Sequence, residues 1–154
     1  MEIKILSIKE FIYYKLNENK NIKVVAATSS GNNYKQIKHK LLLKYNDSLI
    51  GDNIFTDEHA KKIIKFVKKV KENTTLYCLC DAGQSRSAAV AASLELYCNG
   101  DDSHIWKNCK YYPNILIYKT MCKNLNINIS EAEIKEKVKI NQEALKNLIK
   151  NGGV

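Results

Sequence analysis

The chain has 154 residues, about the length of one domain, and its 45% of apolar residues excludes an intrinsically disordered protein. No apolar run reaches the about 18 residues of a membrane span, and one proline with six glycines excludes collagen-like and linker classes. The net charge is +9, and because Arg86 is the only arginine, 24 of the 25 basic residues are lysines. The lysines are spread along the chain, so we interpret most of them as solvated surface.

Five cysteines are present, an odd number, and the first residues lack the pattern of a secretory signal. These features predict a reduced, cytoplasmic protein rather than a disulfide framework. No C-x-x-C pair occurs, so we expect no metal ion and no cofactor.

Three short apolar runs in the first part of the chain have the length of strands, and they cover residues 3–6, 22–27 and 41–45. Between the first two runs, Ser7 and Glu10 have the spacing of a capping box. This pattern predicts a helix that begins after Ser7 and continues to about Leu16.

The central part of the chain predicts a helix, a strand and a second helix. Thr56 has the character of an N-cap, and the helix after it places apolar residues on one face as far as Val70. Residues 75–79 predict a strand. The segment 87–98 is apolar almost all round, so we expect a helix buried at the centre of the domain. His59 and His39 lie among lysines and are expected at the surface.

Three further helices are expected: a short one near Ile105, one from Pro113, and one from the Ser130–Glu133 capping box to about Lys150, stopped by Gly152. Strands that alternate with helices predict an α/β fold with a mostly parallel central sheet of about four strands flanked by helices. We expect one domain over residues 1–154, with a phosphate-binding loop between a strand and the buried central helix.

The segment that carries chemistry connects the strand at 75–79 to this buried helix. Its residues are Cys80, Asp81, Ala82, Gly83, Gln84, Ser85, Arg86 and Ser87. A loop at this place can turn its backbone N–H groups inward and form an anion site at the helix N-terminus. Gly83 supplies the backbone freedom that such a turn needs. Residues 81–86 are therefore the candidate substrate-binding residues.

The same loop predicts a nucleophile and a phosphate clamp. Inward N–H dipoles and Arg86 favour the thiolate form of Cys80, which can attack phosphorus and form a phosphocysteine. Arg86 offers a planar fork for two phosphate oxygens, which the many lysines cannot offer. Ser87 is expected to donate a hydrogen bond to the sulfur and help it depart.

A general acid is expected from the connection after the strand at 41–45. A right-handed crossover makes this strand parallel to the strand at 75–79, so Asp47 and Cys80 should lie at the same edge of the sheet. Asp52 lies farther along the same connection. We favour Asp47 because it is nearer the strand end, with Asp52 as the alternative.

The CxxGxxRS pattern of the loop resembles the Cys-x5-Arg-(Ser/Thr) signature of the protein tyrosine phosphatase superfamily. Its Ala-Gly and Ser-Arg-Ser portions are most similar to the small, dual-specificity-like microbial branch. The resemblance extends over about residues 41–125. It implies a two-step mechanism without metal, in which Cys80 is the nucleophile, Arg86 the phosphate clamp and Asp47 the general acid. The sequence departs from the family at Leu79, where histidine is usual.

The expected function is hydrolysis of phosphotyrosine, with phosphoserine and phosphothreonine as further candidate substrates, in a phosphorylated protein or peptide. Two alternatives stay open. One is a phosphate-pocket or basic nucleic-acid-binding module with weak turnover because of Leu79. The other is an RNA 5′-phosphatase that uses the same loop. Nucleic acid is the less favoured partner, and no membrane partner is expected.

Overall fold

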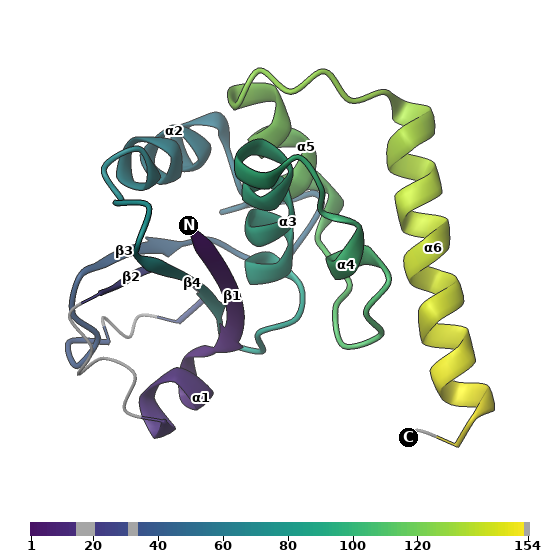
Figure 1. Ribbon diagram of the computed structural model, residues 1–154, viewed down its shortest axis with the longest axis horizontal. Helices are drawn as coiled ribbons and strands as arrows, with labels where there is room; N and C mark the ends of the chain where they lie inside the picture. The colour runs from purple at the N-terminus through teal and green to yellow at the C-terminus, as the bar shows by residue number, and fades with distance from the viewer. Residues whose placement is uncertain (15–20, 31–33, 153–154) are drawn as a thin grey trace.

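The computed structural model describes residues 1–14, 21–30 and 34–152. Its strands are β1 (Glu2–Ser7), β2 (Ile22–Thr28), β3 (Lys40–Lys44) and β4 (Thr75–Cys80). Its helices are α1 (Ile8–Tyr13), α2 (Asp57–Val67), α3 (Arg86–Asn99), α4 (Ser103–Trp106), α5 (Ile115–Asn124) and α6 (Glu131–Lys150). The four strands form one sheet with helices on both faces (Figure 1), which confirms the expected α/β fold.

All neighbouring strands of the sheet are parallel, in the order β1-β4-β2-β3. The strand that ends in Cys80 is therefore central, and Cys80 pairs in register with Ser7 on one side and with Ala27 on the other. Parallel pairing brings the carboxyl ends of all four strands to one edge, where ligands bind in open α/β sheets. Polar residues that follow different strands meet at this edge.

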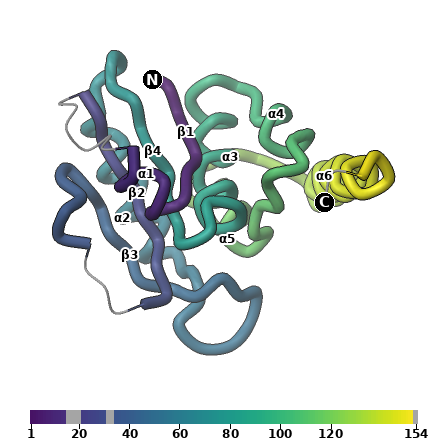
Figure 2. The backbone as a smooth tube through the Cα atoms, turned by 90° about the horizontal axis from the view of Figure 1, so that it is seen from below, coloured from purple at the N-terminus to yellow at the C-terminus, as the bar shows by residue number. Residues whose placement is uncertain are grey.

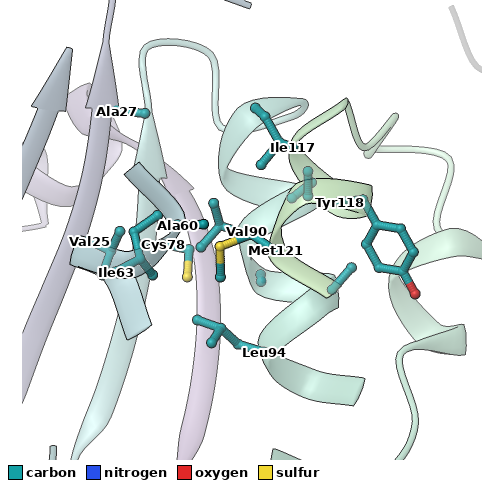
Figure 3. Close-up of a cluster of buried hydrophobic side chains, with 14 of the residues drawn as sticks. Val25, Ala27, Ala60, Ile63, Cys78, Val90, Leu94, Ile117, Tyr118 and Met121 are labelled. Atoms are coloured by element: carbon teal, nitrogen blue, oxygen red, sulfur yellow. The ribbon is translucent and has the colours of Figure 1, made fainter. Parts of the chain in front are cut away.

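Two apolar clusters cover the two faces of the sheet. The smaller one lies on the side of α1 and includes Phe11, Tyr77 and Leu79. The larger one lies on the side of α2, α3 and α5. Figure 3 shows part of it, with Val25 and Cys78 of the sheet close to Val90 of α3. Residues 86–95 of α3 are all buried, as expected for a helix that is apolar almost all round.

A buried carboxylate connects the outer helices to this core. Asp102 is 1% exposed and accepts hydrogen bonds from Trp106 Nε1 at 2.8 Å and from Tyr118 Oη at 2.7 Å. It also forms an ion pair with Lys137, which attaches α6 to α4. Figure 2 shows α6 at the side of the molecule, away from the sheet. Within the described ranges, no helix combines the length and apolar content needed to cross a bilayer.

Helix ends differ from the sequence-based expectations in three places. The α1 helix ends at Tyr13, before the expected end near Leu16, which lies outside the described residues. The α2 helix ends at Val67, so Val70 follows it in a turn. The α5 helix begins at Ile115, two residues after Pro113, because the side chain of Asn114 caps it by accepting from the backbone N–H of Ile117.

His59 is not the free surface residue that its lysine-rich surroundings suggested. Its ring packs against Phe55 and Tyr45, and Nδ1 accepts a hydrogen bond from the Thr56 backbone N–H at 3.1 Å. Partial burial lowers the pKa of His59 below its ordinary value, which favours the neutral ring that can act as acceptor. Histidine thus replaces the usual Glu or Gln of a capping box at the start of α2.

Candidate active site

The loop after β4 turns tightly because one of its residues has a left-handed backbone. Gly83 has φ of 69°, a conformation that glycine adopts without strain. It also lies directly against the junction of β1 and α1, where an added Cβ would come within 2.3 Å of the Ser7 nitrogen. The expected need for glycine in the loop therefore has two causes, the backbone angle and this close approach.

The Cys80 thiol lies at the base of the loop and is 1% exposed. Its Sγ accepts a hydrogen bond from the Gly83 backbone N–H at 3.2 Å and lies 3.1 Å from Ser87 Oγ. The structure thus brings together the sulfur, the loop backbone and the hydroxyl that the sequence named. Leu79, the preceding residue, is 1% exposed and packs in the smaller apolar cluster on the α1 face of the sheet.

The Arg86 guanidinium is buried, with a side chain 7% exposed, and acceptors that follow three different strands orient it. Its Nη1 donates to Ser29 Oγ at 2.9 Å and to the Tyr45 carbonyl at 3.0 Å. Its Nη2 donates to Asp81 Oδ2 at 2.8 Å. The Nε atom has no hydrogen-bond partner among the described residues, although it is fully buried.

This pattern leaves part of the guanidinium available for a ligand. Arginine has five N–H donors, of which two on Nη1 and one on Nη2 are engaged. The N–H of Nε and one N–H of Nη2 remain, and Nε and Nη2 form an edge of the guanidinium that can bind a phosphate or carboxylate in a bidentate manner. A buried donor without a partner is costly, so the Nε edge of the guanidinium is a candidate contact for a bound anion.

Asp47 reaches the loop from the segment after β3. Its Oδ1 accepts hydrogen bonds from Ser85 Oγ at 2.9 Å and from Asn114 Nδ2 at 2.8 Å. Asp52 is exposed, and its backbone carbonyl accepts a hydrogen bond from the Asn46 side chain at 3.3 Å. Of the two candidate acids, Asp47 is therefore the one whose carboxylate has a contact with the loop among the described hydrogen bonds.

Asp81, the residue after Cys80, makes its contacts through its side chain. Its carboxylate accepts from Arg86, from Thr28 Oγ1 at 3.0 Å, from the Ser29 backbone N–H at 3.3 Å and from Tyr34 Oη at 3.4 Å. Partial burial alone would raise the pKa of Asp81, but these hydrogen bonds outweigh it and hold the pKa below its ordinary value. The carboxylate is therefore charged at neutral pH.

Two tyrosines border the loop, and sequence reasoning did not assign either of them to the site. Tyr34 contacts Asp81, and Tyr112 donates from Oη to Gln84 Oε1 at 2.9 Å. The backbone N–H of Tyr112 also donates to the Gln84 carbonyl at 3.1 Å. Ala82 lies between these contacts and is exposed. Aromatic residues next to a glycine-rich loop are a weak sequence signal, because they pack in cores more often than at sites.

Asn114 and Ser29 were also missed. Asn114 both caps α5 and donates to Asp47, and Ser29 accepts from Arg86. For Asn114, the sequence indicated only that a helix begins near Pro113, and nothing in it indicated a contact with Asp47. Within the described residues, no group of three or more His, Cys, Asp or Glu side chains gathers in a way that could hold a metal ion.

No family model matches this chain, and no curated protein matches it. Solved structures of similar fold include PTPMT1, with a TM-score of 0.46 and 16% identity over 97% of this chain and 95% of that chain. The structure of PTPMT1 in complex with PI(5)P has a TM-score of 0.45 and 15% identity, and the match covers 95% of this chain and 94% of that chain. A leucine rich repeat and phosphatase domain containing protein from Entamoeba histolytica has a TM-score of 0.46 and 13% identity, and the match covers 95% of this chain and 89% of that chain. At these identities and TM-scores, the similarity supports no conclusion about activity or substrate. Any such conclusion has to come from the residues of the site.

The contact between Gly83 and the β1–α1 junction predicts that Gly83→Ala is more damaging than an alanine at another glycine with positive φ. Gly100 is the matched control, because its φ is 78° and an added Cβ would meet no atom within 4 Å. Gly100→Ala should cost only the backbone strain, about 1–2 kcal/mol, whereas Gly83→Ala should cost at least twice this amount. Urea denaturation of both variants measures the difference. Equal losses of unfolding free energy in the two variants would contradict the close packing of Gly83 against the Ser7 backbone.

Proposed function

We propose that the protein is a cysteine-dependent phosphomonoester hydrolase of the protein tyrosine phosphatase superfamily, similar to its small dual-specificity branch. The observation that carries the proposal is the buried Arg86 side chain, whose Nε has no partner among the described residues, at the end of a loop that begins at Cys80 and donates to its thiol. A planar donor pair, a nucleophile and a helix N-terminus in one loop suit a tetrahedral oxyanion.

In the first step, Cys80 Sγ attacks phosphorus as a thiolate. The S–P bond forms, the P–O bond to the leaving group breaks, and the leaving oxygen takes a proton from Asp47. Ser85 and Asn114 hold the Asp47 carboxyl group beside the loop, where it can give its proton to the leaving oxygen. The products of this step are a free alcohol and a phosphocysteine.

In the second step, water attacks the phosphocysteine. Asp47, now a carboxylate, takes a proton from the water, the new O–P bond forms and the S–P bond breaks. The thiolate that leaves accepts a hydrogen bond from the Ser87 hydroxyl, which lies 3.1 Å from the sulfur. Inorganic phosphate is released and the enzyme returns to its starting state.

The loop stabilises the charge on the transferred phosphoryl group in both steps. The α3 helix begins at Arg86, and the Ser85 side chain does not cap it, because its hydroxyl donates to Asp47 instead. The first N–H groups of this 14-residue helix are thus available to the equatorial oxygens, together with the Arg86 fork. Donors fixed in place before reaction need no reorganisation in the transition state.

We further propose phosphotyrosine in a protein or peptide as the substrate. Tyr34 and Tyr112 are held at different residues of the loop by hydrogen bonds to Asp81 and Gln84, and aromatic side chains beside the loop are suited to contact with an aryl group. Phosphoserine and phosphothreonine carry the same phosphate on a shorter side chain. A comparison of the three phosphopeptides with a 5′-phosphorylated RNA tests this choice, and RNA as the preferred substrate would overturn it.

The free cysteines support a reducing, cytoplasmic setting for this chemistry. All five lie within the described residues, and none forms a disulfide. A thiolate nucleophile must stay reduced to react, so this setting fits the proposed role of Cys80.

Arg86→Lys tests whether the fork, rather than the charge, is required. Lysine retains the positive charge but cannot supply the Nε and Nη2 donors, so we expect kcat for an aryl phosphate, assayed without metal, to fall by about 10²–10³, nearly as far as in Arg86→Ala. Steady-state kinetics measure both variants. Retained turnover in Arg86→Lys would contradict the phosphate-clamp role. An unmodified protein that binds phosphate without any turnover would instead support a binding module.

Asp47→Asn tests the general acid, with Asp52→Asn as the matched control. We expect Asp47→Asn to lower kcat/KM by about 10²–10⁴ for phenyl phosphate, and by less for p-nitrophenyl phosphate, whose leaving group needs less help from a proton. Asp52→Asn should have little effect, since its carbonyl contact does not involve the carboxylate. The reverse order of the two variants would assign the role to Asp52.

A further inference from the structure

Asp81 places a negative charge inside a loop that has to bind a negative ligand. Its carboxylate is fixed from several sides, because Arg86, Thr28, Ser29 and Tyr34 all donate to it. Thr28 is the last residue of β2, and Ser29 and Tyr34 follow it in the chain, so the carboxylate links the loop to the end of the neighbouring strand. Together these donors fix the position of the carboxylate in the loop.

The two partners of the Arg86–Asp81 ion pair differ in exposure. The Arg86 side chain is 7% exposed, whereas the Asp81 side chain is 38% exposed. The positive charge of the pair is therefore buried in the protein, and the negative charge reaches the surface at the rim of the loop. The whole chain carries +9, but the rim beside Tyr34 presents a carboxylate.

We propose that Asp81 is a specificity-determining residue that disfavours substrates with a second negative group beside the phosphate that is cleaved. The proposal rests on the proposed phosphatase function of the same loop. The favoured substrates are phosphomonoesters with neutral or basic neighbours, and the disfavoured ones carry acidic residues or further phosphates next to the scissile group.

The physical basis is repulsion between like charges at the rim. A fixed carboxylate and a substrate anion a few ångströms away repel each other at a surface where water and salt screen the interaction only in part. Asp81 also repels the reacting phosphate, but this effect is common to all substrates and cancels in a ratio of two substrates. Selectivity against a second charge is therefore separable from any effect of Asp81 on Arg86.

The test compares two phosphotyrosine peptides of equal length, one with glutamate and one with glutamine on both sides of the phosphotyrosine. Asp81→Asn removes the charge but retains an oxygen acceptor for Arg86. We expect the kcat/KM ratio of the glutamate peptide to the glutamine peptide to rise about five- to tenfold in this variant, and the rise to shrink at high salt.

Glu72→Gln is the matched control, because Glu72 is exposed in the turn before β4, at the opposite end of that strand from Cys80. It changes the net charge equally and should leave the ratio within about twofold.

The outcomes separate this inference from the function on which it rests. If the unmodified protein turns over neither peptide nor an aryl phosphate, the proposed function itself fails. If it turns them over and Asp81→Asn leaves the ratio unchanged, the specificity role is wrong while the phosphatase function stands. An equal fall in kcat/KM for both peptides would also overturn the specificity role and leave Asp81 as a residue that only positions Arg86.

Discussion

A buried guanidinium needs acceptors for its donors, since an unpaired buried charge is costly. Arg86 meets this need with three acceptors, and each belongs to the segment after a different strand: Ser29 after β2, the Tyr45 carbonyl after β3 and Asp81 after β4. The single arginine of the chain therefore connects three strand ends. If any of these strands shifted in register, one acceptor would be lost. The three acceptors thus fix the orientation of the guanidinium, including its remaining Nε donor, relative to the sheet.

The other side of the loop depends on the same sheet. Cys80 pairs in register with Ser7, and Gly83 lies against the Ser7 backbone, so the loop is held between its own arginine network and the junction of β1 and α1. Ser7 in turn forms the capping box of α1 with Glu10, through hydrogen bonds of 2.8 Å and 3.1 Å. A rigid frame of this kind allows a site to present its donors in one geometry before a ligand binds.

Local patterns in the sequence predicted the parts of the structure that local interactions determine. The Ser7–Glu10 and Ser130–Glu133 capping boxes form as expected. The apolar run of α3 is buried as far as Glu95, whereas Tyr97 and Cys98 in its last turn are exposed. The approach of Asp47 to the loop was also predictable, because strand direction alone decides which connections meet at one edge of a parallel sheet. The contacts of Asn114 with Asp47 and of Asp81 with Thr28 were not. These pairs are 67 and 53 residues apart, and no local pattern encodes which side chains meet over such distances.

In the proposed mechanism Cys80 carries the phosphoryl group between the two steps, and trapping this phosphocysteine tests the mechanism most directly. An aryl phosphate is mixed with the protein in the absence of metal, the reaction is quenched within its first turnover, and the phosphorylated residue is located by mass spectrometry. We predict phosphate on Cys80, formed together with one equivalent of the phenol, and none on this residue when hydrolysis is complete. Phosphate on another residue, or steady hydrolysis in Cys80→Ser, would contradict the account.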